Sequence, residues 1–267
     1  MSSLGATIEP GRPAGRFDGF SRAALKLGIR EVRLSLRNPE VFVPNLVLPV
    51  ALFFIFVAAL STFARDAGIQ NYGGFFLPLA IVFAVVGGSA GLYMASDIES
   101  GYFDKLLVTP VSRSALLLGP MGADLVRIFV QGLLTASIAM ATGTEIATGV
   151  LGAVVMVLIS SLFGLAFEAL GFAIALRTGN PAASRSLAEF MFPLFLLTTS
   201  FAPIEAMSGW LATAARLNPL TYVFGGLRAL TLSGWDADEI MLAVATAGLL
   251  VAVALALALR ALRAHVR

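Results

Sequence analysis

The sequence of 267 residues contains no cysteine and a single histidine, His265, close to its end. Disulfides, structural zinc sites and most nucleophilic catalysis need one of these two residue types, so the chain lacks the side chains that they require. Charge is scarce too: 13% of the residues are charged and 58% are hydrophobic, whereas a soluble domain has about 25% and about 45–50%. This composition excludes an ordinary soluble enzyme and indicates a membrane protein.

A nucleotide-binding loop is also missing. The phosphate-binding motif Gly-x-x-x-x-Gly-Lys-[Ser/Thr] requires a lysine followed by a hydroxyl residue, but the two lysines, Lys26 and Lys105, are each followed by leucine. We therefore expect no catalytic residues, no metal site and no cofactor in this chain, and no nucleic-acid partner.

What the chain does contain is a series of long apolar segments. Each membrane-spanning helix needs roughly 20 mostly apolar residues. The segments predict an all-α integral membrane protein with six spans, at about 41–62, 75–96, 116–141, 149–176, 190–201 and 240–259.

The remaining segments surround this predicted six-helix domain, which covers residues 38–267. Residues 1–16 are expected to form a disordered tail. Residues 17–37 alternate apolar and basic side chains, which predicts an amphipathic helix at the membrane surface with its basic residues facing anionic lipid. Residues 202–239 are interrupted by proline and glycine, which predicts short, broken helices dipping into the outer membrane face.

The placement of lysine and arginine predicts the orientation. Fourteen of these residues fall on the side of the two termini and three on the opposite side, with Arg127 inside a span. By the positive-inside rule both termini are cytoplasmic and residues 202–239 face outward. We expect a multi-pass protein of a bacterial plasma membrane.

Three motifs occur in order along the chain. Arg37-Asn38-Pro39, followed by Pro49, opens the first span, and Glu99-x-Gly101-x-x-x-Lys105-Leu106-Leu107-x-Thr109-Pro110-x-x-Arg113 follows the second. The third runs from Ser200 to Leu211, then through Asn218-Pro219-Leu220-Thr221-Tyr222 to Gly226-Leu227-Arg228. Together they resemble the permease subunits of type-2 ABC exporters, and the third resembles the outer-loop signature of the daunorubicin-resistance type of drug-exporter permease. One departure is Ser208, where that branch commonly has proline.

The resemblance implies a subunit that pairs with a second permease, identical or different, and with two ATP-binding subunits that hold ATP and magnesium. Such an exporter moves a hydrophobic or amphipathic small molecule, such as a drug, an antibiotic or a lipid, out of the cytoplasm or inner leaflet by alternating access. The alternatives are a secondary transporter driven by an ion gradient, with Asp124 and Glu168 as proton sites, and a non-transporting membrane protein. No inverted repeat, which many secondary transporters have, is visible in the sequence.

The charged stretch 97–113 predicts a short amphipathic helix on the cytoplasmic face, ended by a proline. The resemblance implies that this helix couples the permease to the ATPase, and we expect Glu99 and Gly101 to position it; the alternative is a helix that merely caps two spans. The residues assigned to coupling are Glu99, Gly101, Tyr102, Asp104, Lys105, Leu106, Leu107, Pro110 and Arg113.

Polar residues inside the predicted spans are expensive in lipid and therefore face protein or water. Asp124, Arg127 and Gln131 share one face of the third span, and we favour a local Asp124–Arg127 ion pair over a substrate or proton site. Three roles stay open for Glu168 in the fourth span: a protonated acid, a partner of another helix, or a wall of the substrate path.

The outward segment contributes a last group of residues. The resemblance implies a re-entrant region that helps to close the exit route, and the alternative is an interfacial anchor in the aromatic belt. Its residues are Pro203, Trp210, Asn218, Pro219, Tyr222 and Arg228. Glycines of the second and fourth spans, among them Gly91 and Gly171, predict close helix packing.

Overall fold

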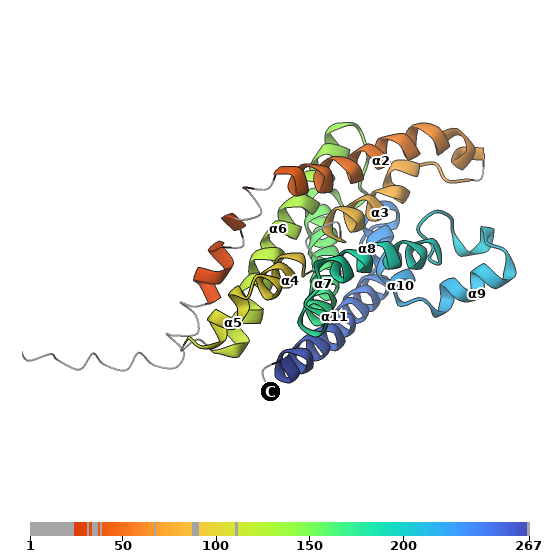
Figure 1. Ribbon diagram of the computed structural model, residues 1–267. Helices are drawn as coiled ribbons and strands as arrows, with labels where there is room; N and C mark the ends of the chain where they lie inside the picture. The colour runs from red at the N-terminus through yellow and green to blue at the C-terminus, as the bar shows by residue number, and fades with distance from the viewer. Residues whose placement is uncertain are drawn as a thin grey trace, which may run out of the picture.

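A computed structural model (Figure 1) describes residues 24–30, 32–33, 37, 39–66, 68–86, 91–109 and 112–265. The predicted tail 1–16, the first part of the predicted surface helix and Pro110 lie outside the described residues. Every regular element among the described residues is helical. The helices are α2 (Pro39–Asp66), α3 (Tyr72–Val86), α4 (Leu92–Glu99), α5 (Tyr102–Leu107), α6 (Arg113–Ala141), α7 (Gly149–Thr178), α8 (Pro181–Leu196), α9 (Gly209–Leu217), α10 (Pro219–Arg228) and α11 (Ala237–His265), with a 3₁₀ turn at Ile204–Ala206 and a π-helical turn at Ala229–Ser233.

Among the described residues, four helices are long and apolar enough to cross a membrane: Val47–Asp66, Ser114–Ala141, Gly149–Thr178 and Ala237–His265. They fall where the sequence predicts the first, third, fourth and sixth spans. Two shorter helices, α3 with 15 residues and α8 with 16, occupy the places of the second and fifth. The described part of the chain is therefore all-helical, as the composition predicts, and its long apolar helices are consistent with a membrane protein.

The second predicted span differs most from the structure. The sequence predicts one helix over 75–96, whereas α3 ends at Val86 and α4 starts afresh at Leu92. Gly91 begins α4 with a φ of 77°, and a Cβ added there would lie 2.4 Å from the carbonyl carbon of Gly171 in α7. A left-handed residue that close to another backbone has to be glycine. Average hydropathy does not register such a break, so the apolar run reads as continuous.

The fifth predicted span is displaced as well. Helix α8 starts at Pro181, nine positions before the expected 190, so most of the expected loop 177–189 is helical. Its start is a standard cap: the Asn180 side chain accepts a hydrogen bond of 2.8 Å from the backbone N–H of Ala182, and proline takes the first helical position. Polar residues in its first turns obscure this start in a hydropathy profile.

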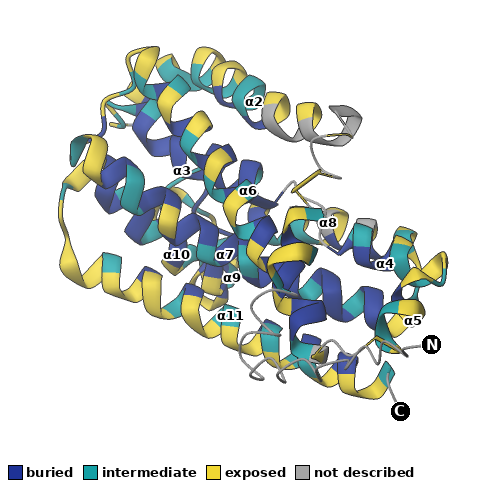
Figure 2. Cartoon of the chain, turned by 90° about the vertical axis from the view of Figure 1, so that its left-hand side faces the viewer, coloured by how far each residue is buried: buried dark blue, intermediate teal, exposed yellow. Residues whose placement is uncertain are grey.

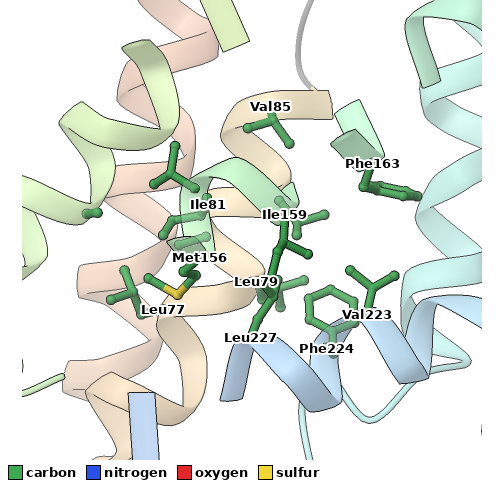
Figure 3. Close-up of a cluster of buried hydrophobic side chains, with 14 of the residues drawn as sticks. Leu77, Leu79, Ile81, Val85, Met156, Ile159, Phe163, Val223, Phe224 and Leu227 are labelled. Carbon is green, nitrogen blue, oxygen red and sulfur yellow. The ribbon is translucent and has the colours of Figure 1, made fainter. Parts of the chain in front are cut away.

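The core lies where α7 meets its neighbours. Figure 2 shows buried residues concentrated along α7 and α3, while α11 exposes most of its length. Figure 3 shows Leu79 of α3, Ile159 of α7 and Phe224 of α10 pointing into one cluster, so the short helix α10 packs inside the bundle. Because lipid is as apolar as these side chains, close packing holds the helices together.

The loops gather at two ends of the bundle. At one end, which we call the coupling end, the α4–α5 corner lies beside the C-terminal turn of α11, where His265 Nδ1 is 2.9 Å from the carbonyl oxygen of Leu176 (Figure 1). At the far end, Asn71 Nδ2 donates to the Glu145 carbonyl over 2.9 Å, and Thr148 Oγ1 donates to the Leu230 carbonyl over 2.7 Å. The positive-inside rule predicts that the coupling end faces the cytoplasm and the far end the outside, and this orientation stays a prediction.

Candidate coupling surface and intramembrane polar cluster

The coupling residues occupy a corner between two short helices. The sequence predicts a single helix in 97–113, but the chain turns at Gly101, which adopts a left-handed φ of 69° between α4 and α5. A Cβ at Gly101 would meet none of the described residues within 4 Å, so the backbone angle alone favours glycine there. Helix α5 ends at Leu107, and Arg113 opens α6.

The α4–α5 corner has an apolar side and a charged side. Phe103 is 2% exposed, and Leu106 and Leu107 are half-buried beside it in the core at this end. Glu99, Asp104 and Lys105 are exposed. The corner is therefore fixed to the bundle through its apolar side chains and carries exposed charged groups on its other side.

An ion pair joins this corner to the N-terminal segment. Arg30 Nη1 and Nη2 each lie 2.7 Å from one carboxylate oxygen of Asp97, and the guanidinium carbon is 4.6 Å from the centre of the Tyr102 ring. Arg30 thus pairs with a carboxylate of the bundle, a contact that the predicted amphipathic pattern of 17–37 does not reveal. Residues 24–30 can lie this close because α6 offers Gly119 to them, where a Cβ would be 2.7 Å from the carbonyl oxygen of Ala24.

A second contact joins the corner to α11 and α7. The rings of Phe103 and His265 meet edge to face with centroids 5.6 Å apart, and the same histidine donates Nδ1–H to the Leu176 carbonyl near the end of α7. The sequence gives no signal for this role, because the only histidine follows an apolar span in a basic terminal segment. These contacts link α5 to α11 directly and to α7 through His265.

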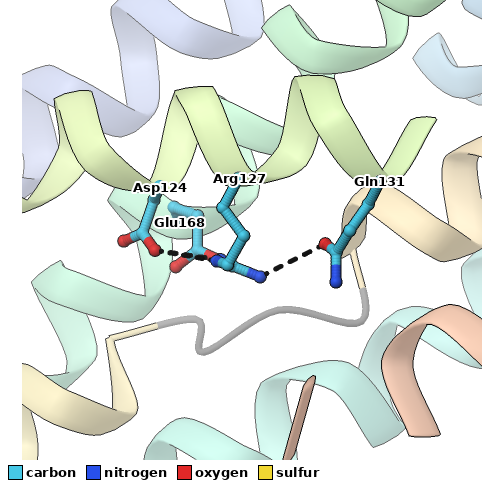
Figure 4. Close-up of polar contacts among 4 residues, drawn as sticks. All are labelled: Asp124, Arg127, Gln131 and Glu168. Carbon is cyan, nitrogen blue, oxygen red and sulfur yellow. Dashed lines mark hydrogen bonds and ion pairs between the residues drawn. The ribbon is translucent and has the colours of Figure 1, made fainter. Parts of the chain in front are cut away.

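The intramembrane polar residues form one cluster across α6 and α7 (Figure 4). Arg127 Nη2 lies 2.9 Å from Asp124 Oδ1 and 2.9 Å from Glu168 Oε1, and Arg127 Nη1 donates to Gln131 Oε1 over 3.4 Å. The local Asp124–Arg127 ion pair expected from the spacing is present. Of the three roles open for Glu168, the geometry is that of a residue paired with another helix.

Burial makes this cluster energetically important. The carboxylates of Asp124 and Glu168 are 2% and 0% exposed, and Arg127 is 10% exposed. A buried carboxylate is costly unless it is paired and hydrogen-bonded, and one guanidinium serves both groups here. The cluster therefore joins α6 to α7 at a fixed register.

The predicted outer residues lie along the chain from the end of α8 to the end of α10. Asn218 Nδ2 donates to the carbonyls of Leu194 and Leu197, over 2.9 and 3.1 Å, and its Oδ1 accepts from the Leu220 N–H over 3.0 Å. Pro219 takes the first position of α10. One side chain thus ends α8 and starts α10.

The other outer residues divide between packed and exposed. The Arg228 guanidinium carbon lies 3.8 Å above the ring of Phe75, and its Nε donates to the Phe75 carbonyl over 3.3 Å. Tyr222 donates its hydroxyl to the Arg216 carbonyl over 2.7 Å. Pro203 precedes the 3₁₀ turn, and Trp210 is 71% exposed on α9. The structure brings these residues into one region without gathering them at one point.

Comparison with known proteins decides the family. Residues 24–232, which include the α4–α5 corner, the polar cluster and α9–α10, match the ABC-2 type transporter family. The chain belongs to this family. As a family member it is a transmembrane permease of an ABC transporter, and such permeases carry no catalytic site and work with ATP-binding subunits.

Two relatives support this assignment over most of their length. The chain is 27% identical over 262 residues to the daunorubicin resistance ABC transporter permease protein DrrB1 of Streptomyces coeruleorubidus, covering 90% of this chain and 92% of the relative. It is 28% identical over 211 residues to the "Putative transport permease ycf38" of Cyanophora paradoxa, covering 74% and 71%. The resemblance seen in the sequence motifs is therefore confirmed.

Proposed function

We propose that this ABC-2 permease belongs to an ATP-driven exporter of a bacterial plasma membrane, with both termini in the cytoplasm. It works with a second permease subunit, identical or different, and with two ATP-binding subunits that hold ATP and magnesium. The observation that carries the proposal is the α4–α5 corner, which exposes charged side chains within a chain that has few of them.

The corner is suited to transmit force. The ATP-binding subunits move when they close on ATP, and a permease element that follows them has to be rigid and firmly attached. Buried Phe103 attaches α5 to His265, and Asp97 attaches α4 to Arg30. A push on the charged side therefore passes mainly through Phe103 to α11 and α7, which switches the transport path between its two sides, while the Arg30–Asp97 pair is the weaker attachment.

The cargo we propose is a hydrophobic or amphipathic small molecule, such as a drug, an antibiotic or a lipid. The relative from Streptomyces coeruleorubidus is named for daunorubicin resistance. Asp124 and Glu168, the carboxylates of α6 and α7, are both engaged with Arg127, which leaves mainly apolar surface for a substrate in that part of the bundle.

The same cluster argues against a transporter driven by an ion gradient. Such a transporter would use Asp124 and Glu168 as proton sites, whereas both carboxylates contact the Arg127 guanidinium. We expect Glu168→Gln, which keeps a hydrogen-bond acceptor for Arg127, to leave the pH dependence of transport unchanged. A shift of the pH profile would favour the proton-coupled alternative.

Reconstitution tests the proposal. The permease and its ATP-binding partner are inserted into liposomes, and ATP hydrolysis is measured together with movement of a hydrophobic fluorescent dye. We expect transport to require ATP. Transport that persists without ATP, or that stops when only the proton gradient is removed, would overturn the assignment.

Two variants test the coupling role. Gly101→Trp adds bulk at a position where an added Cβ meets none of the described residues within 4 Å, so we expect the new ring to clash with a docked partner. Gly101→Ala is the matched control, because it imposes the same left-handed backbone angle without the bulk. We expect Gly101→Trp and Glu99→Ala to insert normally and to lose stimulation of the ATPase, while Gly101→Ala keeps most of it. Full transport and full stimulation in both Gly101→Trp and Glu99→Ala would exclude this role.

A further inference from the structure

An apolar pocket of about 400 Å³ lies between α7, α8, α11 and the junction of α9 with α10. A pocket of this size is within the range of small-ligand sites. The pocket is separate from the intramembrane polar cluster, which lies where α7 packs against α6. Its walls include Phe163 and Phe167 of α7, Met191 and Leu194 of α8, Leu220 of α10 and Leu250 of α11.

The pocket has almost no polar groups with which a water molecule could form hydrogen bonds. Among the described residues that line it, Asn218 alone has a polar side chain, and both ends of its amide are occupied by the carbonyls of Leu194 and Leu197 and by the Leu220 N–H. A buried water needs two to four polar partners, and apolar cavities of about 150 Å³ stay dry and take up benzene. A larger apolar cavity therefore takes up hydrocarbon in preference to water.

The depth of the pocket in the membrane determines which hydrocarbon groups surround it. Phe163 stands near the middle of the 30-residue α7, and Leu250 stands near the middle of the 29-residue α11. At about 1.5 Å per residue the pocket lies roughly 20 Å from the ends of both helices, within the hydrocarbon layer. Two lining residues, Leu217 and Val253, are 80% and 52% exposed, so the pocket opens on the outer surface of the bundle.

We propose that this pocket binds one acyl chain of a membrane lipid. Lipid tails surround the helices at this depth, and they are the most abundant apolar molecules there. The chain fills the space between α7, α8 and α11 and packs against the α9–α10 junction. This inference does not depend on the direction of transport or on the identity of the cargo.

Photochemical labelling tests the site. The intact chain is reconstituted with phosphatidylglycerol that carries a diazirine in the middle of one acyl chain, irradiated, digested and analysed by mass spectrometry. We expect labels on lining residues such as Met191 and Leu194, in excess of labels on equally apolar exposed positions. Val253→Trp, which places a large ring at the pocket opening, should lower this labelling several-fold.

Leu249→Trp is the matched control, because Leu249 is 65% exposed on the same helix about one turn earlier and does not line the pocket. It should leave the labelling unchanged. Ala214→Phe fills the pocket from α9 and serves as a second plug if Val253→Trp lowers the thermal stability. A parallel reaction with a small apolar diazirine that has no headgroup separates lipid from other hydrocarbons.

Three results would overturn the proposal. The first is even labelling of all lipid-facing surfaces. The second is pocket labelling that neither plug reduces. The third is labelling of the pocket by the small probe but not by the lipid, which would assign the site to a compact apolar ligand.

Discussion

Replacing Arg127 by methionine removes the guanidinium that both Asp124 and Glu168 contact at 2.9 Å. All three groups are largely buried, and breaking a buried pair by removing one partner costs about 3–5 kcal/mol. For a chain of this size, 1 kcal/mol corresponds to about 2–4 °C in Tm. We therefore expect Arg127→Met to lower Tm by roughly 6–20 °C, which is about 3–5 kcal/mol on that scale.

The assay is thermal unfolding of the purified chain in nanodiscs, followed by circular dichroism. Arg260→Met is the matched control, because Arg260 is exposed on α11 and the change in side chain is identical. The triple variant Arg127→Met, Asp124→Asn and Glu168→Gln removes every charge of the cluster. We expect it to recover most of the lost stability, because a neutral core is often as stable as a buried ion pair.

Two outcomes would refute this reasoning. If Arg127→Met melts with the parent and with Arg260→Met, the cluster does not hold α6 against α7. If the triple variant is no more stable than Arg127→Met, the cost comes from lost packing around the side chain and not from the charge left behind.

The other predictions concern backbone geometry and loop contacts. Gly91→Ala should lower the free energy of unfolding by about 2–5 kcal/mol, because the left-handed backbone angle costs roughly 1–2 kcal/mol and the crowding against α7 costs about 1–3 kcal/mol. Gly101→Ala has the same angle without the crowding and should lose only the first part. Equal losses in Tm for the two variants would contradict the close approach of Gly91 to α7. Asn218→Ala should cost roughly 2–4 kcal/mol from three lost hydrogen bonds, and denaturant unfolding that shows no loss would remove its role in ending α8. Asp97→Asn should speed hydrogen exchange in residues 24–30, which Arg30 tethers, and exchange equal to that of the parent would show that the tether is not needed.

Some features of the fold can be predicted because they depend on neighbours in the sequence. The predicted fourth span, 149–176, agrees with α7 at 149–178. An uninterrupted apolar segment that crosses lipid has to form a helix, because its backbone polar groups can be hydrogen-bonded only within the segment. The Asp124–Arg127 pair follows from a spacing of three residues on one helix. The order of the three motifs is likewise a property of the sequence itself, and it indicates the family.

Other features depend on contacts between distant segments, and no local pattern encodes them. Arg30 and Asp97 are 67 residues apart, and Arg127 and Glu168 are 41 apart. Each charge is visible in the sequence, but its partner is chosen by how the helices cross. The break at Gly91 has the same origin, since its glycine is needed where α4 approaches Gly171. The start of α8 was signalled by Asn180 and Pro181, but an average of hydropathy gives a cap little weight.

The contacts of the α4–α5 corner differ in strength. This difference predicts which contact breaks first when a force displaces the corner. The Arg30–Asp97 pair has side chains that are 32% and 18% exposed, and pairs that reach solvent contribute about 0–1 kcal/mol. Phe103 is 2% exposed against His265 and its neighbours, and removing a buried phenylalanine side chain costs about 3–5 kcal/mol. A displacement of the corner therefore breaks the tether to residues 24–30 first, while α5 keeps its hold on α7 and α11. On the proposed coupling function, we expect the N-terminal segment to serve as a yielding contact and the two long helices to carry the motion into the membrane.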